Sequence, residues 1–201
     1  MTTHRRGMSL IEVMVSTALI SVGLLLVGAL FQFGVKISLN AEERNALQGD
    51  RLRLSRKLQR SLTNSYRSGN TAFYMTNPGP QDDLAICLIT QDSWDDAEQK
   101  ALFGGYDIYY RLNADNTLRH LKLAITPTEV ASPLTETQVR DAILADPGAS
   151  LLQSVNSFEL YIPANGVVTE TLTNPVGLRL TQQTSRDTDL TTELTYLFVS
   201  P

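Results

Sequence analysis

Residues 13 to 35 read VMVSTALISVGLLLVGALFQFGV, and none of them is charged. The hydrocarbon core of a bilayer needs about 20 such residues when they are helical, so this segment is long enough to cross a membrane. Its hydroxyl groups can bond back to helix carbonyls. An ordinary secretory signal has a shorter apolar region, of about 7 to 15 residues, and ends at a small-residue cleavage site. The segment therefore predicts a membrane-spanning helix near the start of the chain.

The residues just before this span, 5 to 13, read RRGMSLIEV. A short basic leader ends at Gly7, apolar residues follow from Met8, and Glu12 stands at the edge of the span. A carboxylate in that position is costly unless it has a partner, which makes it a candidate functional residue. A plain signal anchor with a solvated Glu12 is the main alternative, but it leaves the combination with Gly7 unexplained. The pair Arg5-Arg6 lacks the other features of a twin-arginine signal.

This string resembles the class III signal of type IV prepilins and type II secretion pseudopilins. The resemblance implies that a prepilin peptidase cuts after Gly7 and that Met8, where the family prefers Phe, becomes a methylated N-terminus. It also implies that Glu12, the fifth mature residue, pairs with the N-terminal ammonium group of a neighbouring subunit during filament assembly. The implied location is the bacterial inner membrane, crossed once, with a cytoplasmic N-terminus and a periplasmic or extracellular head, and afterwards the filament.

The pattern divides the chain into a leader at 1–7, a transmembrane or filament-core helix at 8–35, an amphipathic helix at 36–67 and a β-rich head at 68–201. Leucines at helical spacing mark the third part, which we expect to pack on the head. Its basic residues share one face, which we interpret as solvated because no aromatic residue interleaves for base stacking. These basic residues are Arg53, Arg56, Lys57 and Arg60.

The head shows short alternating or continuous apolar runs, which predict antiparallel strands. We expect strands at 84–90, 106–112, 118–125, around 158–162, at 176–180 and at 193–199. The turn residues from Asn113 to Thr117 predict that the second and third of these strands form a hairpin. Thr135 and Gln138 form a capping-box signature before a short helix that stops before Pro147. Gly104-Gly105 is interpreted as a turn. The predicted fold class is α+β, a long N-terminal helix on an antiparallel sheet with one insertion.

Composition and single residues give no sign of catalysis. The net charge is −4 and becomes −6 once Arg5 and Arg6 leave with the leader, which argues against a nucleic-acid partner. Cys87 is predicted to be a small buried hydrophobe, and His120 a surface or edge histidine. Three groups of aspartates could in principle bind calcium, but none follows an EF-hand-like spacing, and we interpret them as exposed loop carboxylates. These groups are Asp82-Asp83, Asp92 with Asp95-Asp96, and Asp187 with Asp189. We therefore expect no enzymatic activity, no catalytic or metal-binding residue, no cofactor and no small-molecule substrate.

The main functional prediction is a minor pilin or pseudopilin that primes a type IV pilus or type II secretion pseudopilus, or lies near its tip. Its implied partners are the prepilin peptidase, other minor and major subunits, and the inner membrane before assembly. Residues 109–112, 118–119 and 175–180 also resemble the heads of J-type pseudopilins and W-type minor pilins. The alternatives are an unprocessed single-pass binding or sensor domain, and a tip adhesin or DNA receptor.

Overall fold

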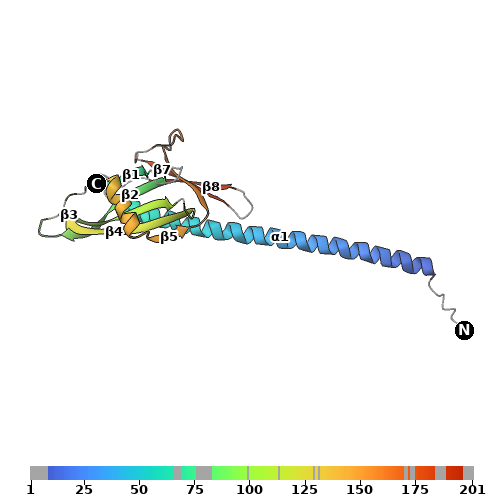
Figure 1. Cartoon of the computed structure of the whole chain (residues 1–201). Helices are drawn as coiled ribbons and strands as arrows, with labels where there is room; N and C mark the ends of the chain where they lie inside the picture. The colour runs from blue at the N-terminus through green and yellow to red at the C-terminus, as the bar shows by residue number, and fades with distance from the viewer. Residues whose placement is uncertain are drawn as a thin grey trace. The chain divides into compact units, whose positions relative to one another are not determined.

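The computed structural model (Figure 1) divides the chain into two units, residues 1–48 and 49–201, which are described separately below. It describes residues 9–65, 69–75, 83–98, 100–112, 114–128, 130, 132–169, 172, 175–183 and 189–196. The two helices are α1 (Leu10–Thr63) and α2 (Glu136–Ala145). The strands are β1 (Thr71–Met75), β2 (Asp83–Asp95), β3 (Lys100–Leu112), β4 (Thr117–Thr128), β5 (Ala149–Leu152), β6 (Val155–Tyr161), β7 (Val176–Gln183) and β8 (Asp189–Tyr196).

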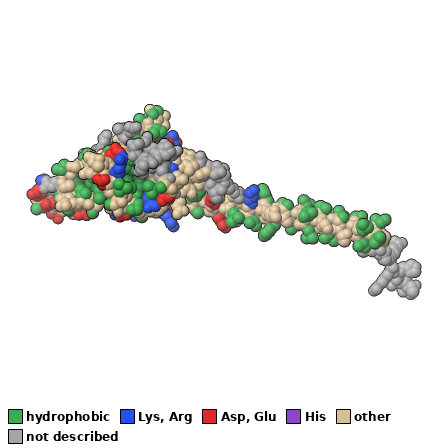
Figure 2. All heavy atoms as spheres, in the orientation of Figure 1, with side chains coloured by type: hydrophobic (Ala, Val, Ile, Leu, Met, Phe, Trp, Pro, Cys, Tyr) green, Lys and Arg blue, Asp and Glu red, His purple; other side chains and the backbone are tan. Residues whose placement is uncertain are grey.

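The first unit is built by the N-terminal part of α1, whose apolar side chains are exposed. Successive residues such as Leu24, Leu25 and Leu26 are each more than 60% exposed, so the helix is apolar around its whole circumference. Figure 2 shows these hydrophobic side chains along the surface of α1. The most apolar window has a mean hydropathy of 2.4 and contains no buried residue. A helix of this kind requires an apolar environment outside its own chain, because water does not solvate such a surface favourably.

Hydroxyl groups inside this apolar helix bond to its own backbone. Thr17 Oγ1 donates to the carbonyl oxygen of Val13 at 2.9 Å, and Ser21 Oγ donates to that of Thr17 at 2.8 Å. The hydroxyls therefore need no water, as expected for a segment that can enter a bilayer. The long N-terminal apolar helix predicted from the sequence is thus confirmed.

The C-terminal part of α1 belongs to the second unit and packs into its core. Leu54, Leu58 and Leu62 recur every four residues and are almost completely buried. The helix ends at Thr63, about one turn before the expected end at Arg67. Directly after the helix, Ser65 forms an isolated antiparallel bridge with Thr90 of β2, which connects the end of α1 to the sheet.

The head contains two antiparallel sheets, where the sequence suggested one. One sheet has five strands in the order β1-β2-β3-β4-β5, and the other has three strands in the order β6-β7-β8. The predicted hairpin of β3 and β4 is present, with Leu112 opposite Thr117. Both strands extend further from the turn than the sequence indicated. Together with α1, the two sheets confirm the α+β class.

The five-stranded sheet is buried on both faces. Leu84, Ile86 and Leu88 of β2 face a core shared with α1 and the three-stranded sheet, while Cys87 and Ile89 face a second core. Burial on both faces explains why β2 reads as a continuous apolar run. Val139 of α2 joins the second core, and α2 crosses the sheet there in Figure 1. The predicted capping box of Thr135 and Gln138 starts this helix.

The prediction of a turn at Gly104-Gly105 is wrong, because both residues lie inside β3. A register shift between Phe103 and Gly105 marks a bulge against β4. A Cβ atom on Gly104 would come within 2.5 Å of the Asp92 Cβ, and one on Gly105 within 2.9 Å of the Leu123 carbonyl oxygen. The two glycines therefore permit close approach of neighbouring strands. Adjacent glycines also occur in turns, so the sequence alone does not distinguish the two roles.

Candidate functional site

The first turn of α1 carries a reciprocal pair of hydrogen bonds between Ser9 and Glu12. The Ser9 backbone N–H donates to the Glu12 carboxylate at 2.9 Å, and the Glu12 backbone N–H donates to Ser9 Oγ at 3.3 Å. This is a capping box, which satisfies two backbone donors that the helix itself leaves unpaired. We did not predict it, although the Ser-x-x-Glu spacing was visible in the sequence. Gly7 and Met8 lie outside the described residues.

The capping box places the Glu12 carboxylate at the positive end of the α1 dipole. Both residues are exposed, so the outer side of the carboxylate is accessible to another group. A negatively charged side chain near a helix N-terminus interacts favourably with the helix dipole. Glu12 is therefore oriented at the start of an apolar helix, where a cation from outside the chain can approach it.

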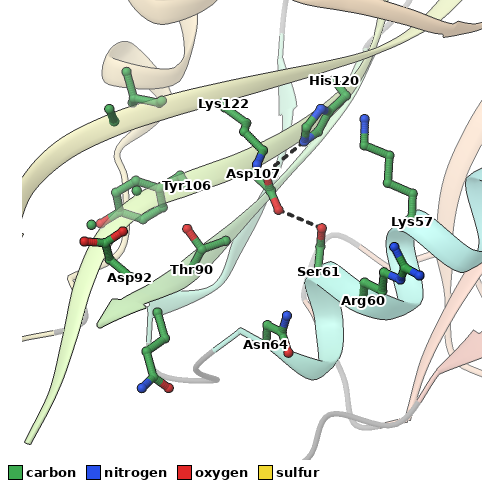
Figure 3. Close-up of a pocket in the computed structure, with 15 residues that line it drawn as sticks. Lys57, Arg60, Ser61, Asn64, Thr90, Asp92, Tyr106, Asp107, His120 and Lys122 are labelled. Atoms are coloured by element: carbon green, nitrogen blue, oxygen red, sulfur yellow. Dashed lines mark hydrogen bonds and ion pairs between the residues drawn. The ribbon is translucent and has the colours of Figure 1, made fainter. Parts of the chain in front are cut away.

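A second polar cluster lies inside the head, between the last turns of α1 and the five-stranded sheet (Figure 3). Ser61 Oγ donates to Asp107 Oδ2 at 2.7 Å, and His120 Nε2 lies 2.8 Å from Asp107 Oδ1. The hydroxyl groups of Tyr109 and Ser61 are also 2.8 Å apart. The cluster thus joins one helix to two neighbouring strands through a single carboxylate.

The prediction that His120 is a surface or edge histidine is wrong. His120 is only 6% exposed, and its strand β4 lies between β3 and β5. The imidazole is accommodated in the interior because the Asp107 carboxylate accepts from it. Burial acts to raise the pKa of Asp107, but the hydrogen bonds from His120 and Ser61 and the charges of His120 and Lys122 lower it overall.

This cluster does not have the arrangement of a nucleophilic triad. In such a triad the serine hydroxyl bonds to the histidine, which removes its proton. Here the hydroxyl of Ser61 donates to one carboxylate oxygen of Asp107, and the imidazole of His120 is hydrogen-bonded to the other. The pKa of this carboxyl is lowered, so it is a poor proton acceptor. The geometry corresponds to a buried structural bridge.

The head also contains the single cysteine of the chain and the acidic residues considered as possible metal ligands. Cys87 is fully buried, as predicted, and burial raises its pKa to about 12. A thiol in this environment is a small core residue and a poor nucleophile. Within the described residues, no three His, Cys, Asp or Glu side chains form a group that could hold a metal ion.

One comparison with known proteins gives a match. Residues 2–28 match the family model of the prokaryotic N-terminal methylation motif. The chain therefore carries a prepilin-type cleavage and methylation motif, which supports a role in a pilus or secretion filament. Together with the long apolar helix, the motif supports the type IV pilin and pseudopilin family. No curated protein and no solved structure matches the chain.

The match supports a coarse role for the chain. Proteins with this motif are structural subunits of a pilus or a secretion filament and are not enzymes. The motif implies processing by a prepilin peptidase and assembly with other pilins, and it fits a membrane-anchored subunit. The resemblance of the head to J-type and W-type subunits stays a prediction.

Proposed function

We propose that the chain is a minor pilin or pseudopilin that is cleaved after Gly7, methylated on Met8 and assembled by its N-terminal helix, priming the filament or lying near its tip. The observation that carries the proposal is a single carboxylate, Glu12, directly before the uncharged segment 13–35 of α1 and behind a basic leader. The expected topology is a single pass of the bacterial inner membrane, with the N-terminus in the cytoplasm.

Assembly moves α1 from lipid into a bundle of like helices, where a buried charge requires a partner. The N-terminal ammonium group of the neighbouring subunit is such a partner, and methylation leaves its charge in place. A charge-assisted hydrogen bond between this ammonium and Glu12 stabilises the bundle and fixes the axial register between subunits. The capping box supports this role, because the bond from Ser9 holds the carboxylate in one orientation.

Two substitutions of Glu12 separate its charge from its capping bond. Glu12→Ala removes both, whereas Glu12→Gln keeps an oxygen that can accept from the Ser9 backbone. In a host with an active prepilin peptidase, we expect both variants to be cleaved and held in the membrane. Both should be poorly incorporated into filaments, measured by immunoblotting of sheared filaments. Normal incorporation of either variant would contradict the proposed charge pairing.

A further inference from the structure

A polar pocket of about 480 Å³ opens at the end of α1, outside the N-terminal motif. Lys57 and Ser61 line it from α1, and Asn64 lines it from the turn that follows. Thr90, Asp107 and Lys122 line it from β2, β3 and β4. Figure 3 shows these side chains around a common space between the helix and the sheet. The pocket has the size of small-ligand sites in proteins, and it exists only when the head is folded.

The wall of the pocket on the sheet side includes Gly104 and Gly105. A Cβ atom on Gly104 would meet the Asp92 side chain, and one on Gly105 would meet the Leu123 carbonyl oxygen, so neighbouring strands already fill the space beside each glycine. On the helix side, α1 ends at Thr63, and Asn64 lines the pocket directly after it.

The charges of the pocket are unbalanced. Lys57, Arg60 and Lys122 line it, and within the described part of the chain none of the three forms an ion pair. Asp107 is already bonded to Ser61 and His120. Burial lowers the pKa of Lys57, Asp107 raises it, and the nearby charge of Lys122 lowers it again. Two ammonium groups thus repel each other, and the two carboxylates that line the pocket, Asp92 and Asp107, leave one of its three positive charges unbalanced.

A structural role explains only part of this charge. Arg60 lies in the last turn of α1, where a cation stabilises the negative end of the helix dipole. Lys122 comes from β4 and has no such role. Neutral hydrogen-bonding groups from Asn64 and Thr90, and the carboxylate of Asp92, also line the pocket. Cations and neutral donors around one space are the groups that bind a carboxylate.

We propose that this pocket binds a carboxylate group, presented by an acidic side chain of a neighbouring filament subunit. The claim that the pocket binds a carboxylate is independent of the proposed function. The claim that a neighbouring filament subunit carries this carboxylate rests on the proposed function. A net charge of −4 on the whole chain makes a locally positive pocket a selective feature, because most of the surface repels acidic groups.

Carboxylate binding can be tested with sodium succinate on the full chain in detergent micelles. Reductive ¹³C-methylation labels the lysines without removing their charge, and single Lys→Arg variants assign the NMR signals. Lys36 and Lys100 lie outside the pocket and are internal controls. At matched ionic strength in sodium chloride, we expect saturable shifts at Lys57 and Lys122 only.

The variant Lys57→Gln should weaken succinate binding, observed at Lys122, by about tenfold, because a charge-assisted hydrogen bond is lost. Lys100→Gln should leave the affinity unchanged. Thermal unfolding should be the same for both variants. Lys57 forms no ion pair within the described residues, and the Lys100–Glu98 pair is exposed, so it contributes little to stability. The absence of a saturable shift, or equal shifts at all lysines, would overturn the proposal.

The source of the carboxylate is tested in filaments from the native host. A photo-crosslinking amino acid at Asn64, inside the pocket, should crosslink to another subunit, and Lys57→Gln together with Lys122→Gln should abolish this product. The same amino acid at Gln59, an exposed helix residue outside the pocket, controls for general proximity. Filaments that contain the chain but give no crosslink at Asn64 would contradict a subunit as the source. Filaments that lack the chain would instead contradict the proposed function, while the succinate titration still decides on the pocket.

Discussion

The hydroxyl of Ser61 on α1 donates a 2.7 Å hydrogen bond to the carboxylate of Asp107 on β3. Both residues are buried, and the other carboxylate oxygen is bonded to His120 on β4. The bond lies in the part of α1 that belongs to the head unit. Removing one partner of a buried polar group is costly, because the remaining groups lose their hydrogen bonds in the interior. The cluster therefore links the apolar packing of α1 to a specific position on the sheet.

Asp107→Asn should change how stability depends on pH. The pKa of Asp107 is lowered in the folded state, so its contribution to stability is present above the unfolded value of about 3.9 and is lost as the pH falls through the folded value. We expect the variant to lose about 1–3 kcal/mol at pH 7. Its stability should then fall less steeply with acid than that of the wild type. Urea unfolding followed by circular dichroism at neutral and acid pH measures both effects.

Asp141→Asn is the control for this experiment, because Asp141 is an exposed residue of α2. It should unfold like the wild type across the pH range. If the free energy of unfolding falls equally with acid in the wild type and in Asp107→Asn, the ionisation of Asp107 makes no contribution to the pH dependence of stability.

Leu58→Ala should strongly destabilise the head. Leu58 is 1% exposed and packs in the core between α1 and the two sheets. Loss of its side chain should cost about 2–5 kcal/mol in the free energy of unfolding. The matched control is Leu52→Ala on the same helix, because Leu52 is 61% exposed. This control should change stability by about 0.5 kcal/mol or less, and a similar loss in both variants would be incompatible with the packing of α1 described above.

Gly148→Ala and Gly166→Ala separate backbone strain from steric overlap. Both glycines have positive φ, of 65° and 69°. A Cβ atom on Gly148 would come within 2.4 Å of the His120 carbonyl oxygen, whereas nothing lies within 4 Å of one on Gly166. We expect about 1–2 kcal/mol of destabilisation at Gly166, from conformation alone, and more at Gly148. Thermal unfolding checks the order, and an equal loss in both variants would contradict the close contact at β4.

Cys87 should react with iodoacetamide only after the head unfolds. Its thiol is buried and its pKa is raised to about 12, so both access and the thiolate form are suppressed. We expect no alkylation of the native chain at pH 8 and complete alkylation in guanidinium chloride, detected by mass spectrometry. Ser93→Cys in the Cys87→Ala background supplies an exposed thiol on the same strand. Comparable native reaction rates for the two thiols would contradict the burial of Cys87.

Local patterns predicted much of this fold. The uncharged run at 13–35 predicted the apolar helix, and the alternation around Asn113–Thr117 predicted the hairpin of β3 and β4. Thr135 and Gln138 predicted the start of α2. Each of these features depends on neighbours in the sequence, so the residues themselves carry the necessary information.

The errors concern features that depend on distant partners. His120 is buried because Asp107 on the next strand bonds to it, and Gly104 lies in a strand because Asp92 packs against its backbone. The pocket was not predicted because Lys57 and Lys122 are far apart in the sequence and line the same pocket only in the folded head. The capping box of Ser9 and Glu12 is different, since its signal was local but was overlooked beside the cleavage motif.

Processing as a prepilin can be tested by the mass and N-terminal sequence of the protein from membranes of its native host. We predict a chain that begins at Met8 and is heavier by one methyl group. A Gly7→Val variant should remain uncleaved and serve as a size control. A wild-type chain that still begins at Met1, in a host whose prepilin peptidase is active, would contradict the account and indicate a signal-anchored domain.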